Sequence, residues 1–173
     1  LNQKCKIILF TERVNILADF FDFEKISNTI DSTNIKLWKD KGICDLTNFD
    51  IINRVTLKKK DWGKLLCKAT KPTLLVINRA FLTVSSIYSK ITESDCNLIL
   101  HDECHNTSSI QCHQFLTTCK SMNIPIVGFS ATPLRTGHDD KAKLLEIYGK
   151  SDNPEELNLL TNYNMIYAIS KEL

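Results

Sequence analysis

Four short and almost continuous apolar runs restrict the fold of this sequence more than any other feature. They cover residues 6–10, 73–77, 97–101 and 124–129. Strands that are apolar on both faces are typical of parallel sheets covered by helices, whereas half-exposed strands alternate apolar and polar residues. The runs therefore predict a parallel β-sheet.

Helical periodicity beside these runs completes an α/β pattern. Residues 108–122, between the last two runs, place five apolar side chains on one helical face: Cys112, Phe115, Leu116, Cys119 and Met122. Residues 12–23, 141–148 and 155–171 also favour helices. Strands alternating with helices predict an open, doubly wound α/β sheet, in which chemistry is expected at the carboxyl ends of the strands.

The length of 173 residues suits one globular domain with a substantial core. Residues 24–71 are less regular, and we expect a crossover that carries an irregular insertion there. A further helical segment is expected at about 154–173. We therefore predict a single domain that spans residues 1–173.

Two adjacent acids come directly after the third apolar run. The sequence from 98 to 106 reads LILHDECHN, which places Asp102, Glu103 and His105 at the end of a strand. An aspartate in this position can hold Mg²⁺, usually through its water shell, beside the phosphates of a nucleotide. The next acid can polarise an attacking water, which makes Glu103 the candidate general base. A plainer alternative is that the two acids cap the following turn.

A second motif comes directly after the fourth run, where the sequence continues as SATPLR from Ser130. DECH followed by GFSATPLR resembles motifs II and III of the superfamily 2 DExH-box helicases and translocases. The stretches NLILHDECHN, IPIVGFSATPLRTG and LLTNYNMIYAISK are similar to helicases of giant DNA viruses. The resemblance implies a RecA-like P-loop NTPase lobe, ATP and Mg²⁺ as cofactors, and ATP-driven movement on DNA or RNA.

The resemblance also implies roles for single residues. Asp102 would be the magnesium ligand, with Glu103 nearby as the catalytic acid that orients water. His105 would sense the γ-phosphate and couple to motif III and to a second lobe. The coupling motif III itself would be Ser130, Ala131 and Thr132. No base or oxyanion arrangement beside Ser130 points to acyl transfer.

Nucleic-acid contacts are expected where two other runs end. Thr11 and Arg13 stand where the family places motif Ia, and the resemblance implies that they contact the phosphodiester backbone. The alternative is a helix cap and a surface arginine. Asn78 and Arg79 stand near the family's motif Ib or Ic, although their sequence departs from its commoner, threonine-centred form.

The phosphate-binding motif GxxxxGK[ST] does not occur in the 173 residues. The resemblance therefore implies a first RecA-like lobe without motif I, whose partner is the second lobe of a longer protein. It also implies that the segment at about 154–173 leads to that second lobe. The intact protein would be an ATP-dependent helicase, and this chain alone would be inactive. Two alternatives stay open: an ATP-independent module that binds nucleic acid or a protein, and a subunit of a restriction-type translocase.

Composition adds limits on partners and location. The net charge of +2 sums 22 basic and 20 acidic residues, so no global field attracts nucleic acid, and the lysine run at 58–60 is typical of a solvated loop. Seven cysteines without a CxxC pair, and no signal peptide or long apolar span, predict a reduced intracellular protein without a membrane partner. If the protein is viral, the host cytoplasm, a replication factory or the virion is expected.

Two metal-binding alternatives fit less well. A metalloprotease HExxH motif needs the glutamate directly after the first histidine and a helix beneath both, whereas His101 ends an apolar run. Four side chains near one another in sequence are of the types that bind zinc: Cys104, His105, Cys112 and His113. Their spacing matches no common zinc-binding pattern.

Overall fold

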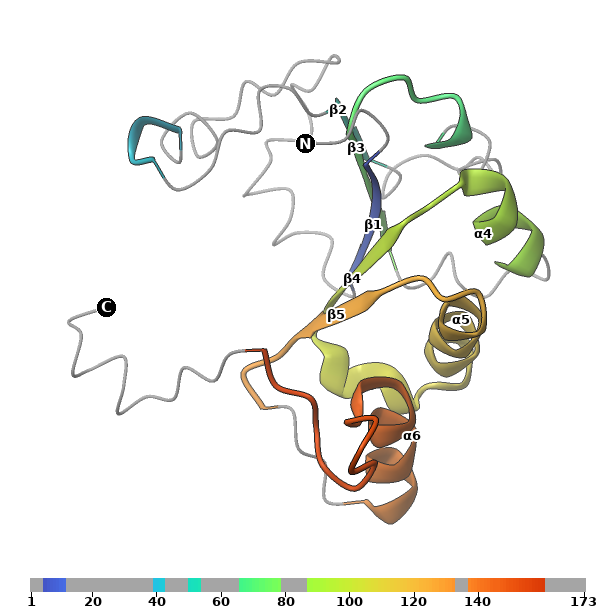
Figure 1. Ribbon diagram of the computed structural model, residues 1–173, viewed down its shortest axis with the longest axis vertical. Helices are drawn as coiled ribbons and strands as arrows, with labels where there is room; N and C mark the ends of the chain where they lie inside the picture. Colours follow the sequence, from blue (N-terminus) through green and yellow to red (C-terminus); the bar gives the residue numbers. More distant parts are fainter. Residues whose placement is uncertain are drawn as a thin grey trace.

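A parallel sheet forms the centre of the computed structural model, which describes residues 5–11, 39–42, 50–53, 66–78, 87–132 and 137–160. Within these residues, five strands lie in the order β2-β3-β1-β4-β5, and every neighbouring pair is parallel (Figure 1). The strands are β1 (Lys6–Thr11), β2 (Asp50–Asn53), β3 (Thr73–Asn78), β4 (Leu98–Asp102) and β5 (Ile126–Phe129). The predicted parallel α/β sheet is confirmed.

Helical elements with both ends in the described residues are α4 (Ile87–Ser94), η2 (Cys104–Ser108, a 3-10 helix), α5 (Ile110–Ser121) and α6 (His138–Tyr148). The α5 face predicted from periodicity is buried at Cys112, Phe115, Leu116 and Cys119, and the helix predicted at 141–148 is the body of α6. Helices α4 and α5 lie on the same side of the sheet (Figure 1). The helix predicted at 12–23 lies outside the described residues.

Two parts of the structure differ from the sequence predictions. Strand β2 lies inside the stretch 24–71, for which only an irregular insertion was expected. The helix predicted from 155 does not form over residues 155–160, the part of that range which the structure describes. Instead, Gly149 and Leu157 form an antiparallel bridge, and the Asn158 amide donates to the Tyr148 carbonyl at 2.7 Å. These bonds fold the segment back along the end of α6.

The hydrophobic core lies between the sheet and its helices. Strand β1 runs between β3 and β4, and Ile8 and Phe10 on it are almost completely buried. Phe10 packs edge to face against Phe115 of α5 with ring centroids 5.2 Å apart. This packing fixes the carboxyl end of β1 against α5.

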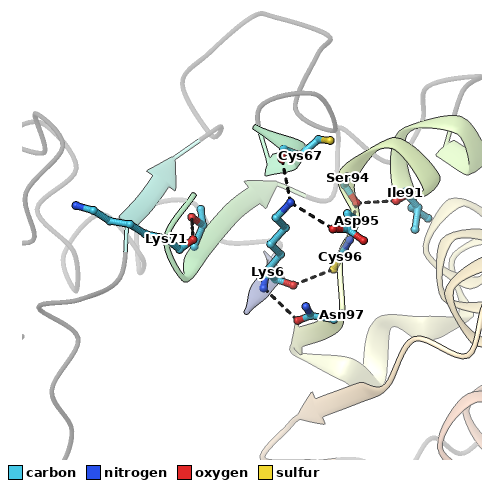
Figure 2. A network of polar contacts seen from close by, with 9 residues as sticks. Lys6, Cys67, Lys71, Ile91, Ser94, Asp95, Cys96 and Asn97 are labelled. Atoms are coloured by element: carbon cyan, nitrogen blue, oxygen red, sulfur yellow. Dashed lines mark hydrogen bonds and ion pairs between the residues drawn. The ribbon is translucent and has the colours of Figure 1, made fainter. Parts of the chain in front are cut away.

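A polar network ties the first residue of β1 to the start of β4 (Figure 2). The buried Lys6 ammonium donates to the Cys67 carbonyl at 2.9 Å and pairs with the Asp95 carboxylate at 3.5 Å. The Lys6 amide donates to the Asn97 side chain at 3.1 Å, and the Cys96 thiol donates to the Lys6 carbonyl at 3.4 Å. A buried charge is tolerated when it is paired and hydrogen-bonded, so this network anchors the amino edge of the sheet.

The Cys96 thiol predicts a loss of stability at alkaline pH. Burial raises the pKa of Cys96 from 9.0 to about 11. The protonated thiol makes its full contribution to stability below pH 9, the pKa that it has in the unfolded chain. This contribution is lost as the pH rises from 9 to about 11, because over that range the thiol ionises in the unfolded chain but not in the folded protein. At pH 10 the loss from one such thiol is on the order of 1 kcal/mol.

Urea unfolding at several pH values between 8 and 10 measures this effect. Cys96→Ala should destabilise the protein at pH 8 through its cavity, yet its free energy of unfolding should fall less steeply with pH than that of the wild type. Equal slopes for the two proteins would contradict the assignment of the raised pKa to Cys96.

Six cysteines lie in the described part of the chain, and none of them forms a disulfide there.

Candidate functional site

Four strands bring their last residues together at the carboxyl edge of the sheet. Thr11 of β1 pairs in register with Asn78 of β3, and Asp102 of β4 pairs with Phe129 of β5. Phe10 pairs with His101, so the next residues, Thr11 and Asp102, lie beside each other. The last residues of these four strands therefore lie along one edge of the sheet.

Thr11 and Asp102 are joined directly. The Thr11 hydroxyl donates to Oδ2 of Asp102 at 2.7 Å, and Thr11 is completely buried. Arg13 and Arg79 lie outside the described residues, and only the backbone of Asn78 is described. The contacts of these four residues with nucleic acid therefore remain predictions. The structure adds a bond between the predicted magnesium ligand and the end of β1.

Removing the Thr11 hydroxyl should lower stability. Thr11→Val keeps the shape of the side chain but leaves the Asp102 carboxylate without this donor. Because hydrogen bonds to charged groups contribute more than neutral ones, we expect a loss of about 1–2 kcal/mol in the free energy of unfolding, measured with urea. Thr118→Val is the matched control, since that exposed hydroxyl donates only to the Gln114 carbonyl of its own helix. Equal losses in the two variants would mean that the bond to Asp102 adds nothing.

Glu103 follows in a conformation that few side chains adopt. Its backbone is left-handed, with φ 54° and ψ 50°, and the chain then enters η2. The Glu103 carbonyl accepts from the Asn106 amide at 2.9 Å, and the Thr107 hydroxyl donates to the Cys104 carbonyl at 2.6 Å. Backbone strain of this kind persists where the surroundings hold it in place, often at functional sites. The turn leaves the Glu103 side chain one-third exposed, at 33%.

His105 connects the two sequence motifs. Its Nδ1 atom lies 2.9 Å from the Ser130 hydroxyl and 3.2 Å from a carboxylate oxygen of Glu103. The Ser130 hydroxyl in turn accepts from the Thr132 amide at 3.1 Å, while the side chains of Ala131 and Thr132 are exposed. One imidazole nitrogen thus contacts both Glu103 and Ser130, the residue directly after β5.

A buried histidine beneath the acids was not among the predicted site residues. His101 is 1% exposed, and its ring stacks on Phe10 at 4.0 Å between centroids. Its Nδ1 lies 2.8 Å from the Tyr148 hydroxyl, and its Nε2 lies 3.7 Å from the Cys112 sulfur. The position of His101 within an apolar run could have indicated this role, because a buried polar ring needs hydrogen-bond partners. The sequence did not reveal which residues those partners are.

The donor atoms at this edge suit a hard cation. Asp102 supplies a carboxylate, and the hydroxyls of Thr11 and Ser130 belong to the same edge of the sheet. Mg²⁺ in nucleotide sites prefers oxygen ligands and is commonly held by one or two carboxylates together with waters and phosphate oxygens. The chemistry of these oxygen donors therefore fits Mg²⁺, and Asp102 as its protein ligand stays a prediction. Among the residues that the structure describes, no group of three or more His, Cys, Asp or Glu side chains is placed to hold a metal ion.

Comparison with known proteins does not assign the chain to a family. No protein-family model matches the sequence, and no curated protein matches it. In the part of the chain that the structure describes, no helix is both long and apolar enough to cross a membrane.

Proposed function

We propose that this chain is the first RecA-like lobe of an ATP-dependent nucleic-acid helicase or translocase of superfamily 2. Its doubly wound α/β sheet would carry the catalytic acids Asp102 and Glu103 at the carboxyl edge. ATP and Mg²⁺ would be its cofactors, and the backbone of DNA or RNA and a second RecA-like lobe its partners.

The acid pair divides the work of hydrolysis. Asp102 would hold Mg²⁺, which offsets charge on the phosphate oxygens when it is bound. Glu103 would accept a hydrogen bond from the attacking water and orient it toward the γ-phosphate. Its partly exposed side chain can reach a ligand at the carboxyl edge, whereas the hydroxyl of buried Thr11 on the neighbouring strand restrains Asp102.

The contact between His105 and Ser130 is the observation that most supports this proposal. Motifs II and III were expected to be coupled, and the 2.9 Å contact supplies a physical link between them. Because the same Nδ1 also approaches Glu103, a change in that carboxylate on nucleotide binding would alter the hydrogen bonding of Ser130. Residues 130–132 would pass this change to the second lobe.

The protein would bind nucleic acid mainly through contacts with its phosphate groups. Arg13 and Arg79 would supply charge, and Thr11 and Asn78 would place these segments at the carboxyl edge, beside Asp102. The bond between Thr11 and Asp102 would then connect the nucleic-acid contact to the magnesium ligand. Phosphate contacts carry little sequence information, which suits a protein that moves along a strand.

Calorimetric titration of Mg-ATP into the 173-residue chain tests whether the phosphate-binding part of the site lies outside these residues. Since these residues contain no GxxxxGK[ST] loop, we expect no saturable binding below millimolar concentration. Tight, magnesium-dependent binding that Asp102→Ala removes would mean that another segment cradles the phosphates, and the proposed lobe boundary would be wrong. Binding of single-stranded nucleic acid by an intact protein that cannot hydrolyse ATP would instead favour an ATP-independent binding module.

A further inference from the structure

We propose that Tyr148, at the end of α6, is a positioning residue for Asp102 and Glu103 and acts through His101. The proposal rests on the proposed function for its catalytic consequence. Its structural part, that Tyr148 fixes the geometry of the acid pair, stands on the contacts alone.

The hydroxyl of Tyr148 reaches the residue that directly precedes Asp102. It lies 2.8 Å from Nδ1 of His101, and the two rings stack with centroids 6.3 Å apart at 30°. Phe10 covers His101 at a centroid distance of 4.0 Å. The imidazole is therefore held between β1 and α6, with the Tyr148 hydroxyl at Nδ1 and the Cys112 sulfur of α5 3.7 Å from Nε2.

Tyr148 also packs beside the turn that carries Glu103. A Cβ atom placed on Gly128 of β5 would lie 3.0 Å from a ring carbon of Tyr148 and 2.7 Å from Cβ of Cys104. Tyr148 and Cys104 therefore occupy the same side of β5 at close range. Cys104 is the first residue of η2, directly after the left-handed Glu103. The ring thus approaches the acid pair from both of its flanks, His101 and Cys104.

The chain after α6 holds Tyr148 in place. Its carbonyl accepts from the Asn158 amide at 2.7 Å, and the next residue, Gly149, bridges to Leu157. The Lys150 ammonium pairs with the Glu156 carboxylate at 2.6 Å across the same loop. Helix α6 itself lies beside the turn at the end of β4 (Figure 1). Burial raises the pKa of Tyr148 above its usual range, so the hydroxyl stays protonated even in alkaline solution.

Tyr148→Phe tests the proposal because it removes the hydroxyl and keeps the ring. In the 173-residue chain, NMR should show a changed ¹⁵N shift for Nδ1 of His101 and displaced amide signals for Asp102, Glu103 and His105. In the intact protein, kcat for ATP hydrolysis should fall about 10-fold or more, with KM for ATP within about twofold, as expected when catalytic groups are misplaced. Thr118→Val, which deletes an exposed hydroxyl on α5, should change neither measurement.

The two readouts separate the positioning role from the proposed activity. Unchanged amide signals at Asp102 to His105 in folded Tyr148→Phe would overturn the positioning role whatever the enzyme does. An intact wild-type protein that hydrolyses no ATP would overturn the proposed function but leave the NMR result to decide on positioning. If Tyr148→Phe does not fold, His101→Asn and His101→Leu replace it. Asn keeps a polar group near the place of Nδ1 and should preserve the signals better than Leu, and equal displacement in both would overturn the role.

Discussion

Replacing Glu103 by glutamine is expected to lower kcat for ATP hydrolysis by the intact protein about 10²–10⁴-fold, the range typical of a lost general base. Glutamine has nearly the same size and can adopt the same place at the end of β4, but its neutral amide is a far weaker base than a carboxylate. Asp102 would still hold Mg²⁺, so the Kd for Mg-ATP should stay within about threefold, or about 0.7 kcal/mol. Single-turnover hydrolysis and equilibrium binding measure the two quantities separately.

Glu93→Gln is the matched control for this change. Glu93 is exposed on α4, away from the carboxyl edge of β4, and the substitution removes the same charge. Its kcat should equal that of the wild type. If Glu103→Gln keeps more than about a tenth of the wild-type kcat, far above the general-base range, Glu103 loses its role. A large rise in Kd with unchanged kcat would place Glu103 in binding instead.

The second large effect is expected on stability, from Gly128→Ala. The new Cβ would meet Cβ of Cys104 at 2.7 Å, its sulfur at 2.9 Å and a ring carbon of Tyr148 at 3.0 Å. All three atoms belong to packed side chains, so β5, η2 or α6 must shift. Overpacking of this kind costs about 1–3 kcal/mol, which urea unfolding would show as a lower free energy of unfolding. Because Cys104 follows Glu103 directly, kcat should fall as well.

Gly137→Ala provides the control for a glycine substitution. At Gly137 the nearest atom to a new Cβ lies 3.6 Å away, which is ordinary contact, and the residue is exposed at the start of α6. Its free energy of unfolding should change by less than about 1 kcal/mol. If both variants lose the same stability, the close approach of η2 and α6 to β5 is not what constrains Gly128.

Periodicity predicted β1, β3, β4 and β5 because each of them is almost continuously apolar in sequence. Strand β5 is nevertheless only partly buried at the edge of the sheet, and its last residue, Phe129, is 52% exposed. Strand β2 was not predicted because only two of its four residues, Ile51 and Ile52, are apolar, which is too short an apolar run. The segment 155–160 was predicted as helix, but bonds to Tyr148 and Gly149 hold it in another path. Long-range pairing of this kind overrides a local preference and leaves no local pattern.

The candidate site was predictable where one strand end carries several functional groups. Three of its residues are neighbours in sequence: Asp102, Glu103 and His105. Ser130 follows another strand of the same sheet, and the carboxyl ends of parallel strands meet at one edge, so this rule alone predicts that the four residues lie close together. The link from His101 to Tyr148 was not predictable, since it joins residues 47 positions apart. The left-handed backbone of Glu103 was also missed, because glutamate does not favour that conformation.

ATP hydrolysis by the intact protein, measured with and without single-stranded nucleic acid, tests the central claim most directly. The account predicts magnesium-dependent turnover that rises severalfold or more as DNA or RNA is added and that disappears in Glu103→Gln. Turnover that Glu103→Gln leaves intact would contradict the assignment of the acid pair. Absence of turnover in a folded intact protein, with nucleic acid bound, would contradict the proposed motor itself.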